Sequence, residues 1–140
     1  MAYDPEDDTP KREAAVNFNS ILVGSDNAQA LVDYYTKLFG EPGFSGGGYS
    51  GWQIGEGFLT VGPHSEVHGQ NVEPGRLIWN IETPEVHAEF ERLKNAGAIV
   101  IREPYVMEGA PGAAIATLAD PDGNYFQLTS PMPLDAGRAA

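Results

Sequence analysis

The chain has 140 residues, enough for one domain with a single hydrophobic core. It contains no cysteine, which excludes disulfides and thiolate chemistry and leads us to expect a cytoplasmic location. Twenty acidic and eight basic residues give a formal net charge of −12, so nucleic acid is not an expected partner, because its phosphate backbone would be repelled.

The two ends of the chain differ in composition from the part between them. Residues 1–13 hold Asp, Glu and Pro but few apolar side chains, so we expect a disordered acidic tail there, and a C-terminal tail over 132–140. The folded domain is then expected over 14–131. No apolar run approaches the roughly 20 residues of a membrane-spanning helix, and the acidic N-terminus is unlike a signal peptide, so we expect no membrane partner.

The first half of the domain predicts a strand, a helix and further strands, in that order. Apolar residues over 16–23 predict the strand. The helix should begin after the cap residues 25–27, whose side-chain oxygens suit free N–H groups, and end at Gly40, where a left-handed residue fits. Strands are expected over 49–54 and 58–61, joined by a glycine turn. The spacing of apolar residues predicts the buried stripe of the helix: Leu31, Tyr34, Tyr35 and Leu38.

The same order recurs in the second half. A strand is expected over 76–82, followed by a helix with Thr83 as its N-cap and Pro84 as its first residue. This helix should end at Gly97, which corresponds to Gly40 and indicates an internal repeat. Its expected buried stripe consists of Val86, Phe90 and Leu93. The remaining strands are expected over 98–102, 113–119 and 125–129.

Three stretches carry a resemblance to a known superfamily: ILVGSDNAQALVDYYTKLFGEPGF, NIETPEVHAEFERLKNAGA and LADPDGNYFQL. The last is the most specific, and its DPDG segment has the residue types of a type I turn. With these stretches the chain resembles the vicinal oxygen chelate superfamily, which includes glyoxalase I, extradiol dioxygenases, methylmalonyl-CoA epimerase and bleomycin-resistance proteins. The resemblance implies an α+β fold of two βαβββ modules that form a cupped mixed sheet with helices on the outer face. It also implies a homodimer and a small-molecule ligand inside the cup.

The resemblance also identifies the positions where metal-using relatives place their ligands, usually His, Gln or Glu. In this sequence those positions hold Asn19, Thr60, Arg76 and Gln127. None of them is an imidazole or a carboxylate, and an arginine would repel a divalent ion. We therefore expect no metal and no cofactor at this site.

Strand alternation predicts which side chains line the cup. One face of the 76–82 strand carries Leu77, Trp79 and Ile81 and should pack on a helix. The more polar face supplies the expected cup residues: Asn19, Thr60, Arg76, Asn80, Tyr125 and Gln127. Trp52 is a further candidate, as a wall that stacks on a planar ligand, with core packing as the alternative.

Arg76 is the most informative of these residues. It either anchors an acidic or carbonyl-bearing ligand, or forms an ion pair or a solvent-facing rim. The strong negative net charge favours a cationic ligand at long range, whereas Arg76 favours an anion locally. The sequence leaves both alternatives open.

These observations predict a metal-independent small-molecule-binding protein of the glyoxalase and bleomycin-resistance type, for example one that sequesters an antibiotic or a toxic metabolite. A second hypothesis is a lyase, isomerase or dioxygenase-type enzyme. Such an enzyme would use a displaced metal site at His64 and His68, although glycine and proline around them favour a surface loop, or a metal-free pair of Tyr125 and a carboxylate base. The candidate bases, each of which is also a plausible loop residue, are Glu56, Glu103 and Glu108. A scaffold without a ligand is the third hypothesis.

Overall fold

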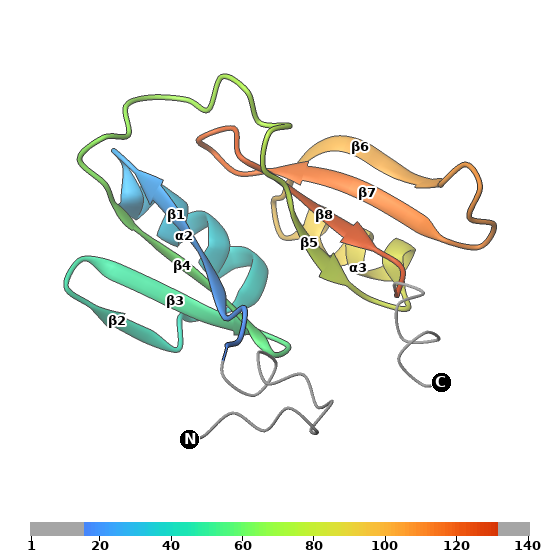
Figure 1. The fold of residues 1–140 in the computed structure, drawn as a ribbon, viewed down its shortest axis with the longest axis horizontal. Coiled ribbons are helices and arrows are strands. Elements are labelled where there is room, and N and C mark those ends of the chain that lie inside the picture. Colours follow the sequence, from blue (N-terminus) through green and yellow to red (C-terminus); the bar gives the residue numbers. More distant parts are fainter. Residues whose placement is uncertain (1–15, 132–140) are drawn as a thin grey trace, which may run out of the picture.

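The computed structural model of the chain describes residues 16–131 (Figure 1). The tails expected over 1–13 and 132–140 lie outside the described residues. In the described part, each half of the chain forms one module of four strands and one helix. The first module consists of β1 (Ser20–Ser25), α2 (Ala28–Phe39), β2 (Phe44–Gly46), β3 (Tyr49–Ile54) and β4 (Gly57–Pro63). The second consists of β5 (Trp79–Glu82), α3 (Val86–Asn95), β6 (Ile99–Val106), β7 (Ala114–Ala119) and β8 (Tyr125–Thr129).

The strands form two four-stranded mixed sheets of the same topology, β1-β4-β3-β2 and β5-β8-β7-β6. In each sheet the first strand pairs in parallel with the last, and the other pairs are antiparallel. This arrangement confirms the predicted α+β fold of two βαβββ modules. β1 and β5 each form an edge of their own sheet, and these two edges face each other (Figure 1).

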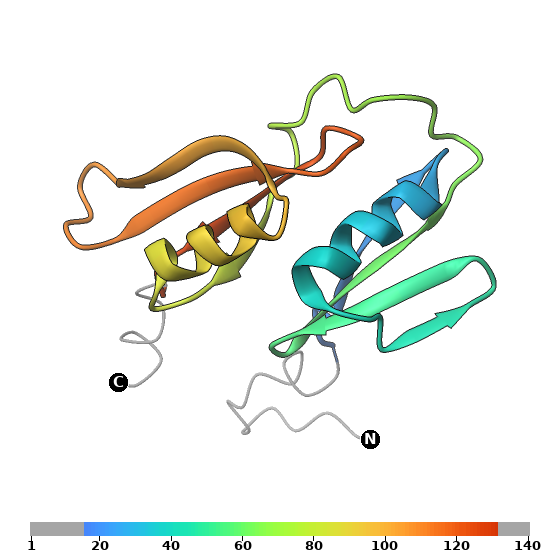
Figure 2. The same cartoon turned by 180° about the vertical axis from the view of Figure 1, so that it is seen from behind.

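Both helices lie on the same side of the two sheets (Figure 2). Their buried residues are those that the apolar spacing predicted: Leu31, Tyr34, Tyr35 and Leu38 on α2, and Val86, Phe90 and Leu93 on α3. The helices start and stop close to the predicted points, and Gly40 and Gly97 both have the positive φ that favours glycine. Within the described residues, no helix is long and apolar enough to cross a membrane.

We call the side of the sheets opposite the helices the open face. Val23, Leu59 and Phe126 belong to the buried core on the helix side. Because successive side chains of a strand point to opposite faces, their neighbours Leu22, Thr60 and Gln127 lie on the open face.

The core is continuous between the modules because their aromatic rings interlock. Tyr35 of α2 lies with its ring centroid 6.0 Å from that of Trp52, 6.2 Å from that of Trp79 and 6.1 Å from that of Phe126. Trp79 stacks on Phe126 at 4.8 Å. Aromatic pairs at such distances add to the stability that their buried area provides, so the cluster ties the second sheet to the first helix.

The DPDG turn between β7 and β8 also ties the modules together. Hydroxyl groups of the first module donate three buried hydrogen bonds to this region: Ser25 Oγ to Asp122 Oδ2 (2.6 Å), Tyr34 Oη to the carbonyl oxygen of Ala119 (2.5 Å) and Tyr35 Oη to Asp120 Oδ2 (2.7 Å). Asp120 is almost fully buried, and its other oxygen accepts hydrogen bonds from the backbone N–H groups of Asp122 and Asn124. The most specific motif of the sequence is therefore an inter-module joint.

Burial affects the ionisation of the groups in this joint. It raises the pKa of Tyr34 to about 12, and it raises the pKa of Tyr35 well above its ordinary value, with the nearby charge of Asp120 adding to the effect. Both phenols are therefore protonated donors at neutral pH. Burial also raises the pKa of Asp122, although the hydrogen bond from Ser25 acts in the opposite direction.

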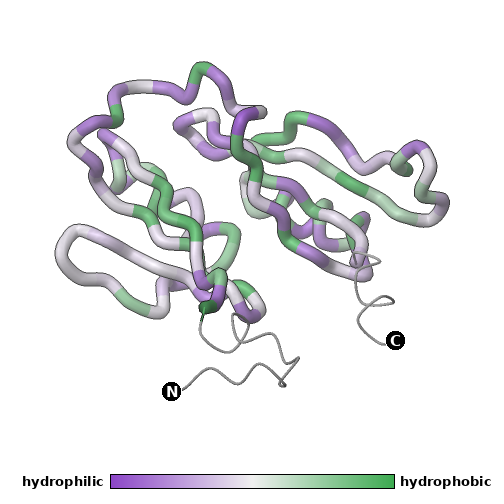
Figure 3. Tube along the Cα trace, viewed as in Figure 1, coloured by the Kyte–Doolittle hydropathy of each residue, from purple (hydrophilic) through white to green (hydrophobic). Residues whose placement is uncertain are grey.

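The segment between β4 and β5, residues 64–78, runs as an arc from one module to the other, and in Figure 3 it alternates between hydrophilic (purple), intermediate (white) and a few hydrophobic (green) stretches. It is fixed to the DPDG turn: the Asn71 N–H donates to the Asp122 carbonyl (2.8 Å), and Gln70 Nε2 donates to the Pro121 carbonyl (2.8 Å). Hydrogen bonds, and not a separate hydrophobic core, thus hold this long connection in place.

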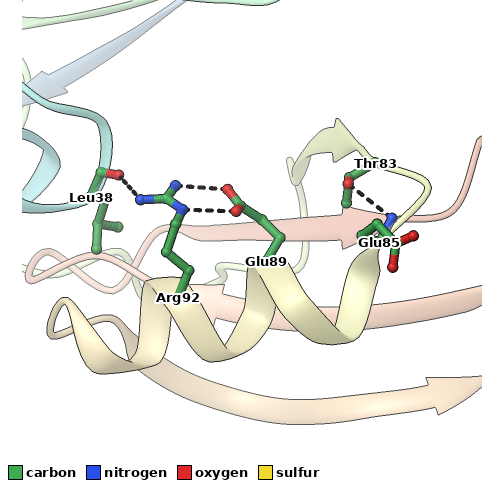
Figure 4. Close-up of polar contacts among 5 residues, drawn as sticks. All are labelled: Leu38, Thr83, Glu85, Glu89 and Arg92. Atoms are coloured by element: carbon green, nitrogen blue, oxygen red, sulfur yellow. Dashed lines mark hydrogen bonds and ion pairs between the residues drawn. The ribbon is translucent and has the colours of Figure 1, made fainter.

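A third link joins α3 to the end of α2 (Figure 4). Arg92 Nη1 donates to the Leu38 carbonyl at 2.9 Å, and its Nε and Nη2 donate to the two carboxylate oxygens of Glu89, each at 2.7 Å. Glu89 therefore aims the guanidinium at a carbonyl that lies in the last turn of the other helix.

One strand was not predicted, and another starts later than expected. β2 lies in the glycine-rich stretch, where few side chains signal a strand. β5 begins at Trp79, not at residue 76, because the Arg76 N–H donates to the Glu73 carbonyl and closes a turn (3.0 Å). Leu77, predicted to pack on a helix, consequently precedes the strand and is 77% exposed.

Other boundaries differ as well, and both β1 and β4 end two residues later than predicted, at Ser25 and Pro63. β1 starts at Ser20 and not at residue 16. Ser20 pairs with Phe58, close to the first residue of β4, so β4 offers no partner to the residues before β1. β6 continues past residue 102 to Val106, through two irregularities in its pairing with β7. Thr83 is not the cap of α3: its Oγ1 accepts the Glu85 N–H (3.1 Å) in a turn that precedes the helix, and Glu85 is the N-cap (Figure 4).

Candidate functional site

A cavity of about 750 Å³ lies between the facing edges of the two sheets, and we call it the inter-module cavity. It is lined by the segment that leads into β1, by the turn between β3 and β4, and by β5 with the residues before it. Its size is typical of small-molecule pockets, which span roughly 300–1,000 Å³. Its apolar wall includes Phe18, Ile21, Phe58, Leu77, Ile78 and Trp79.

Two of the predicted site residues line this cavity from opposite modules. Asn19 comes from the segment before β1, where its carbonyl accepts the Phe58 N–H (3.2 Å) and so fixes the backbone. Asn80 comes from β5. Each amide offers both a donor and an acceptor, so the pair can orient a polar group of a ligand within apolar walls.

Three further predicted residues lie on the open face and do not line the inter-module cavity. Thr60 is on β4, in the first module. Gln127 and Tyr125 are on β8, in the second. Gln127 is next to Asn80 across the β5–β8 pair, and its Nε2 donates to Thr117 Oγ1 (3.0 Å), which holds its side chain along the sheet.

Trp52 lies in the core. It is 2% exposed, and its Nε1 donates to the Gly40 carbonyl (2.8 Å). Its ring lies beside that of Tyr35 on the helix side of the sheet. Of the two alternatives for Trp52, core packing is therefore the correct one, and the ring is not a wall of the cavity.

Arg76 lies outside the cavity, in the connector before β5. Its Nη2 donates to Glu73 Oε2 at 2.9 Å, and its side chain is 71% exposed. Of the alternatives for Arg76, the structure therefore shows an ion pair that faces solvent, and not an anchor for a ligand. The guanidinium does not line the inter-module cavity.

Several residues that line the cavity were not among the predicted site residues. Phe18 and Leu77 are among them, and they are 92% and 77% exposed although apolar. Single exposed apolar residues are common on protein surfaces, and sequence alone does not distinguish an apolar cavity wall from core. Glu82, at the end of β5, also lines the cavity.

The residues proposed for an enzyme are dispersed. Of the three candidate bases only Glu56, in the β3–β4 turn, lines the cavity. His64 and His68 are exposed in the connector, and His64 Nδ1 accepts the Glu66 N–H (3.2 Å). Within residues 16–131, no group of three or more His, Asp or Glu side chains is placed to hold a metal ion.

The positions that hold a metal in the resembling enzymes do not fit one here. Asn19 lines the cavity, Thr60 and Gln127 lie on the open faces of different sheets, and Arg76 is paired with Glu73. The set provides amides, a hydroxyl and a fixed positive charge, whereas divalent ions take carboxylates and imidazoles. These four side chains therefore do not fit a divalent ion.

Comparison with known proteins gives a consistent picture of the fold. The family model described as "Glyoxalase-like domain" matches residues 20–129. Among curated proteins, none matches this chain.

Solved structures share the arrangement of the chain. A glyoxalase-related enzyme from Fulvimarina pelagi is 20% identical, with a TM-score of 0.65 over 82% of this chain and 88% of that one. A glyoxalase/bleomycin resistance protein from Albidiferax ferrireducens T118 is 22% identical, with a TM-score of 0.62 over 81% and 98%. A glyoxalase/bleomycin resistance protein/dioxygenase family enzyme from Burkholderia phytofirmans PsJN is 20% identical, with a TM-score of 0.61 over 81% and 98%. At these identities the likeness concerns the fold.

Proposed function

Since this chain belongs to the glyoxalase-like domain family, we propose that it binds an organic small molecule in its inter-module cavity without the help of a metal ion. The observation that carries this proposal is the cavity itself: about 750 Å³, with mainly apolar walls and an amide from each module. A few placed polar groups in an apolar hollow are what small-molecule sites generally provide.

The chemistry of the residues favours binding over catalysis. The family positions for a metal hold no anionic donor, and of the predicted pair of a carboxylate base and Tyr125 only Glu56 lines the cavity, because Tyr125 lies on β8 away from the lining. Sequestration of an antibiotic or a toxic metabolite needs only tight binding, so it is the concrete form that we propose. A cytoplasmic location remains a prediction from the absence of cysteine.

We also propose that the protein acts as a homodimer. Leu22 and Phe44 lie on the open face and are 53% and 47% exposed. Apolar side chains gathered on one face of a sheet are generally covered by another surface. A second copy that lies against the open face would cover them and enclose Thr60 and Gln127.

A thermal-shift screen with aromatic acids, aldehydes, amines and glycopeptide antibiotics tests the binding proposal. A true ligand at 100 times its dissociation constant should stabilise the fold by about 2.7 kcal/mol. Asn19→Ala and Asn80→Ala should each weaken binding of that ligand about tenfold, because each removes hydrogen bonds at the cavity.

Asn95→Ala, at the exposed end of α3, is the matched control and should leave the affinity unchanged. Dialysis against EDTA should also have no effect. The proposal fails if no compound stabilises the protein, or if stabilisation requires an added divalent ion.

A further inference from the structure

A row of polar side chains crosses the second sheet from β6 to β5 (Figure 1). It consists of four residues that pair directly across neighbouring strands: Arg102, Thr117, Gln127 and Asn80. Directly paired residues point to the same face of a sheet, and the hydrogen bond from Gln127 to Thr117 agrees with this. Because Gln127 lies on the open face, we place all four there and call them the polar row.

Tyr105 gives an independent placement of Arg102. Tyr105 pairs with Ile115, which lies two residues from Thr117 on β7 and therefore shares its face. The guanidinium carbon of Arg102 lies 3.5 Å from the centroid of the Tyr105 ring. The pairing of β6 is irregular on both sides of Arg102, so this contact is a separate indication that the guanidinium lies on the open face.

The contact with Tyr105 leaves the hydrogen-bonding groups of Arg102 accessible. A ring that stacks on a guanidinium covers its face, whereas the N–H groups point outward in its plane. The ion pairs described above involve Arg76 and Arg92, and not Arg102. The exposed Arg102 therefore presents a fixed fork of donors, which matches the geometry of a carboxylate.

Arg102 is also the one positive charge that the described strands carry. Within residues 16–131, the other basic residues lie on the helices and in the connector: Lys37 on α2, Arg92 and Lys94 on α3, and Arg76 before β5. The net charge of −12 repels an anion at long range, but solvent-exposed charges further apart than about 8 Å are largely screened at physiological ionic strength. For a group bound to the polar row, the nearby guanidinium therefore outweighs the net charge.

The polar row begins in the inter-module cavity. Asn80 lines this cavity and pairs with Gln127. Neighbouring strands lie about 4.8 Å apart, so Arg102, three strands away, is roughly 14 Å from Asn80 along the sheet. The Gln127 amide lies between them, held by Thr117, and its carbonyl oxygen can accept a hydrogen bond from a ligand that crosses the row.

We infer that the ligand of the inter-module cavity is an elongated carboxylic acid, with its apolar body in the cavity and its carboxylate at Arg102. This inference rests on the proposed function, since it names the chemical class of the molecule bound there. Arg102 is a specificity-determining residue, and Tyr105 is a positioning residue. The second copy that we propose on the open face would exclude water from the polar row and so strengthen a charge-assisted hydrogen bond there.

The test uses three probes that share a naphthalene ring: 6-(2-naphthyl)hexanoate, the neutral 6-(2-naphthyl)hexan-1-ol and the short 2-naphthoate. In titration calorimetry, the long acid should bind the wild-type protein at least about tenfold more tightly than the alcohol. Arg102→Gln should abolish this difference by weakening the long acid alone. The short naphthoate should be unaffected by this substitution, because its carboxylate does not reach Arg102 from the cavity.

Arg76→Gln is the matched control, because it removes the same charge from an exposed arginine that does not line the cavity. It should change none of the three affinities.

The role of Tyr105 is tested with two variants. Tyr105→Leu should weaken the long acid and leave the alcohol unchanged, whereas Tyr105→Phe keeps the ring and should match the wild-type protein. A purely structural role for Tyr105 would weaken both probes alike. Circular dichroism checks that each variant is folded.

Two results would overturn the inference and leave the proposed function standing: the alcohol binding as tightly as the long acid, or Arg102→Gln weakening both equally. If Arg102→Gln instead weakens dimerisation in sedimentation velocity and leaves the acid unaffected, Arg102 contacts the second copy, and the inference is also rejected. Failure of all three probes would reject it as well. The wider screen with Asn19→Ala and Asn80→Ala then decides the proposed function independently.

Discussion

At the scale of single residues, Asp120 shows how a sequence motif is used. Its carboxylate is 1% exposed and accepts hydrogen bonds from Tyr35 and from the backbone N–H groups of Asp122 and Asn124. A buried carboxylate is costly unless it is fully hydrogen-bonded, so each donor contributes to the stability of the joint. The motif therefore stabilises the arrangement of the modules and does not form part of the cavity.

Tyr35→Phe should lower the free energy of unfolding by about 2 kcal/mol, because it removes one donor to a buried charged group. The measurement is urea denaturation followed by circular dichroism. Tyr49→Phe is the control: the Tyr49 hydroxyl also donates to an acceptor, the Pro63 carbonyl at 3.1 Å, but this bond is exposed. It should cost less than about 0.5 kcal/mol. Equal losses in the two variants would contradict the role given to Asp120.

At the scale of elements, the first sheet contains glycines that are covered by aromatic rings. A Cβ atom on Gly51 would lie 2.1 Å from the Phe44 ring, and one on Gly62 would lie 2.0 Å from the Tyr49 ring. Each ring therefore occupies the space that a side chain would fill. Gly51 of β3 thus leaves room for the ring of Phe44, its pairing partner on β2.

Gly51→Ala should destabilise the protein by about 1 kcal/mol, because the new methyl group displaces the half-exposed Phe44 ring. Gly46→Ala is the matched control in β2, since nothing lies within 4 Å of its Cβ position and its φ is not positive. That variant should be neutral or stabilising by up to about 1 kcal/mol. Thermal unfolding of both variants under one condition measures the difference, and a Gly51→Ala protein as stable as Gly46→Ala would refute the packing explanation.

At the scale of the whole molecule, the two sides of the sheets differ in how they are covered. The helix side is closed by a core that runs through Tyr35, Trp79 and Phe126. Among residues 16–131 the open face has no such cover, and Leu22, on the edge strand β1, remains half-exposed. The homodimer that we propose follows from this asymmetry.

Leu22→Glu should weaken dimerisation at least about tenfold, because it places a charge on the surface that a second copy would cover. Val72→Glu adds the same charge in the connector, where the native side chain is 89% exposed, and should leave the dimer intact. Sedimentation velocity over a range of protein concentrations measures both, with the 15.0 kDa chain as the reference mass. A wild-type protein that stays monomeric at all concentrations would refute the proposed dimer.

The sequence by itself determined the features that depend on local spacing. Both helices with their buried stripes, the strands at 49–54 and 125–129, and the α+β class were predicted, because side chains repeat every 3.6 residues on a helix and every two on a strand. The same alternation separated the helix side of the sheets from the open face.

Only the tertiary structure decided where a ligand can bind. The inter-module cavity exists because β1 and β5 are edge strands of two different sheets. The two strands lie more than 50 residues apart in the chain, and the sequence of neither one specifies how far apart they lie in space. Arg76 was placed on a strand by alternation, but a turn closed by Glu73 starts that strand three residues later and leaves the guanidinium in solvent. The lining of the cavity comes from segments of both modules, so the local pattern of neither half indicated which residues would meet there.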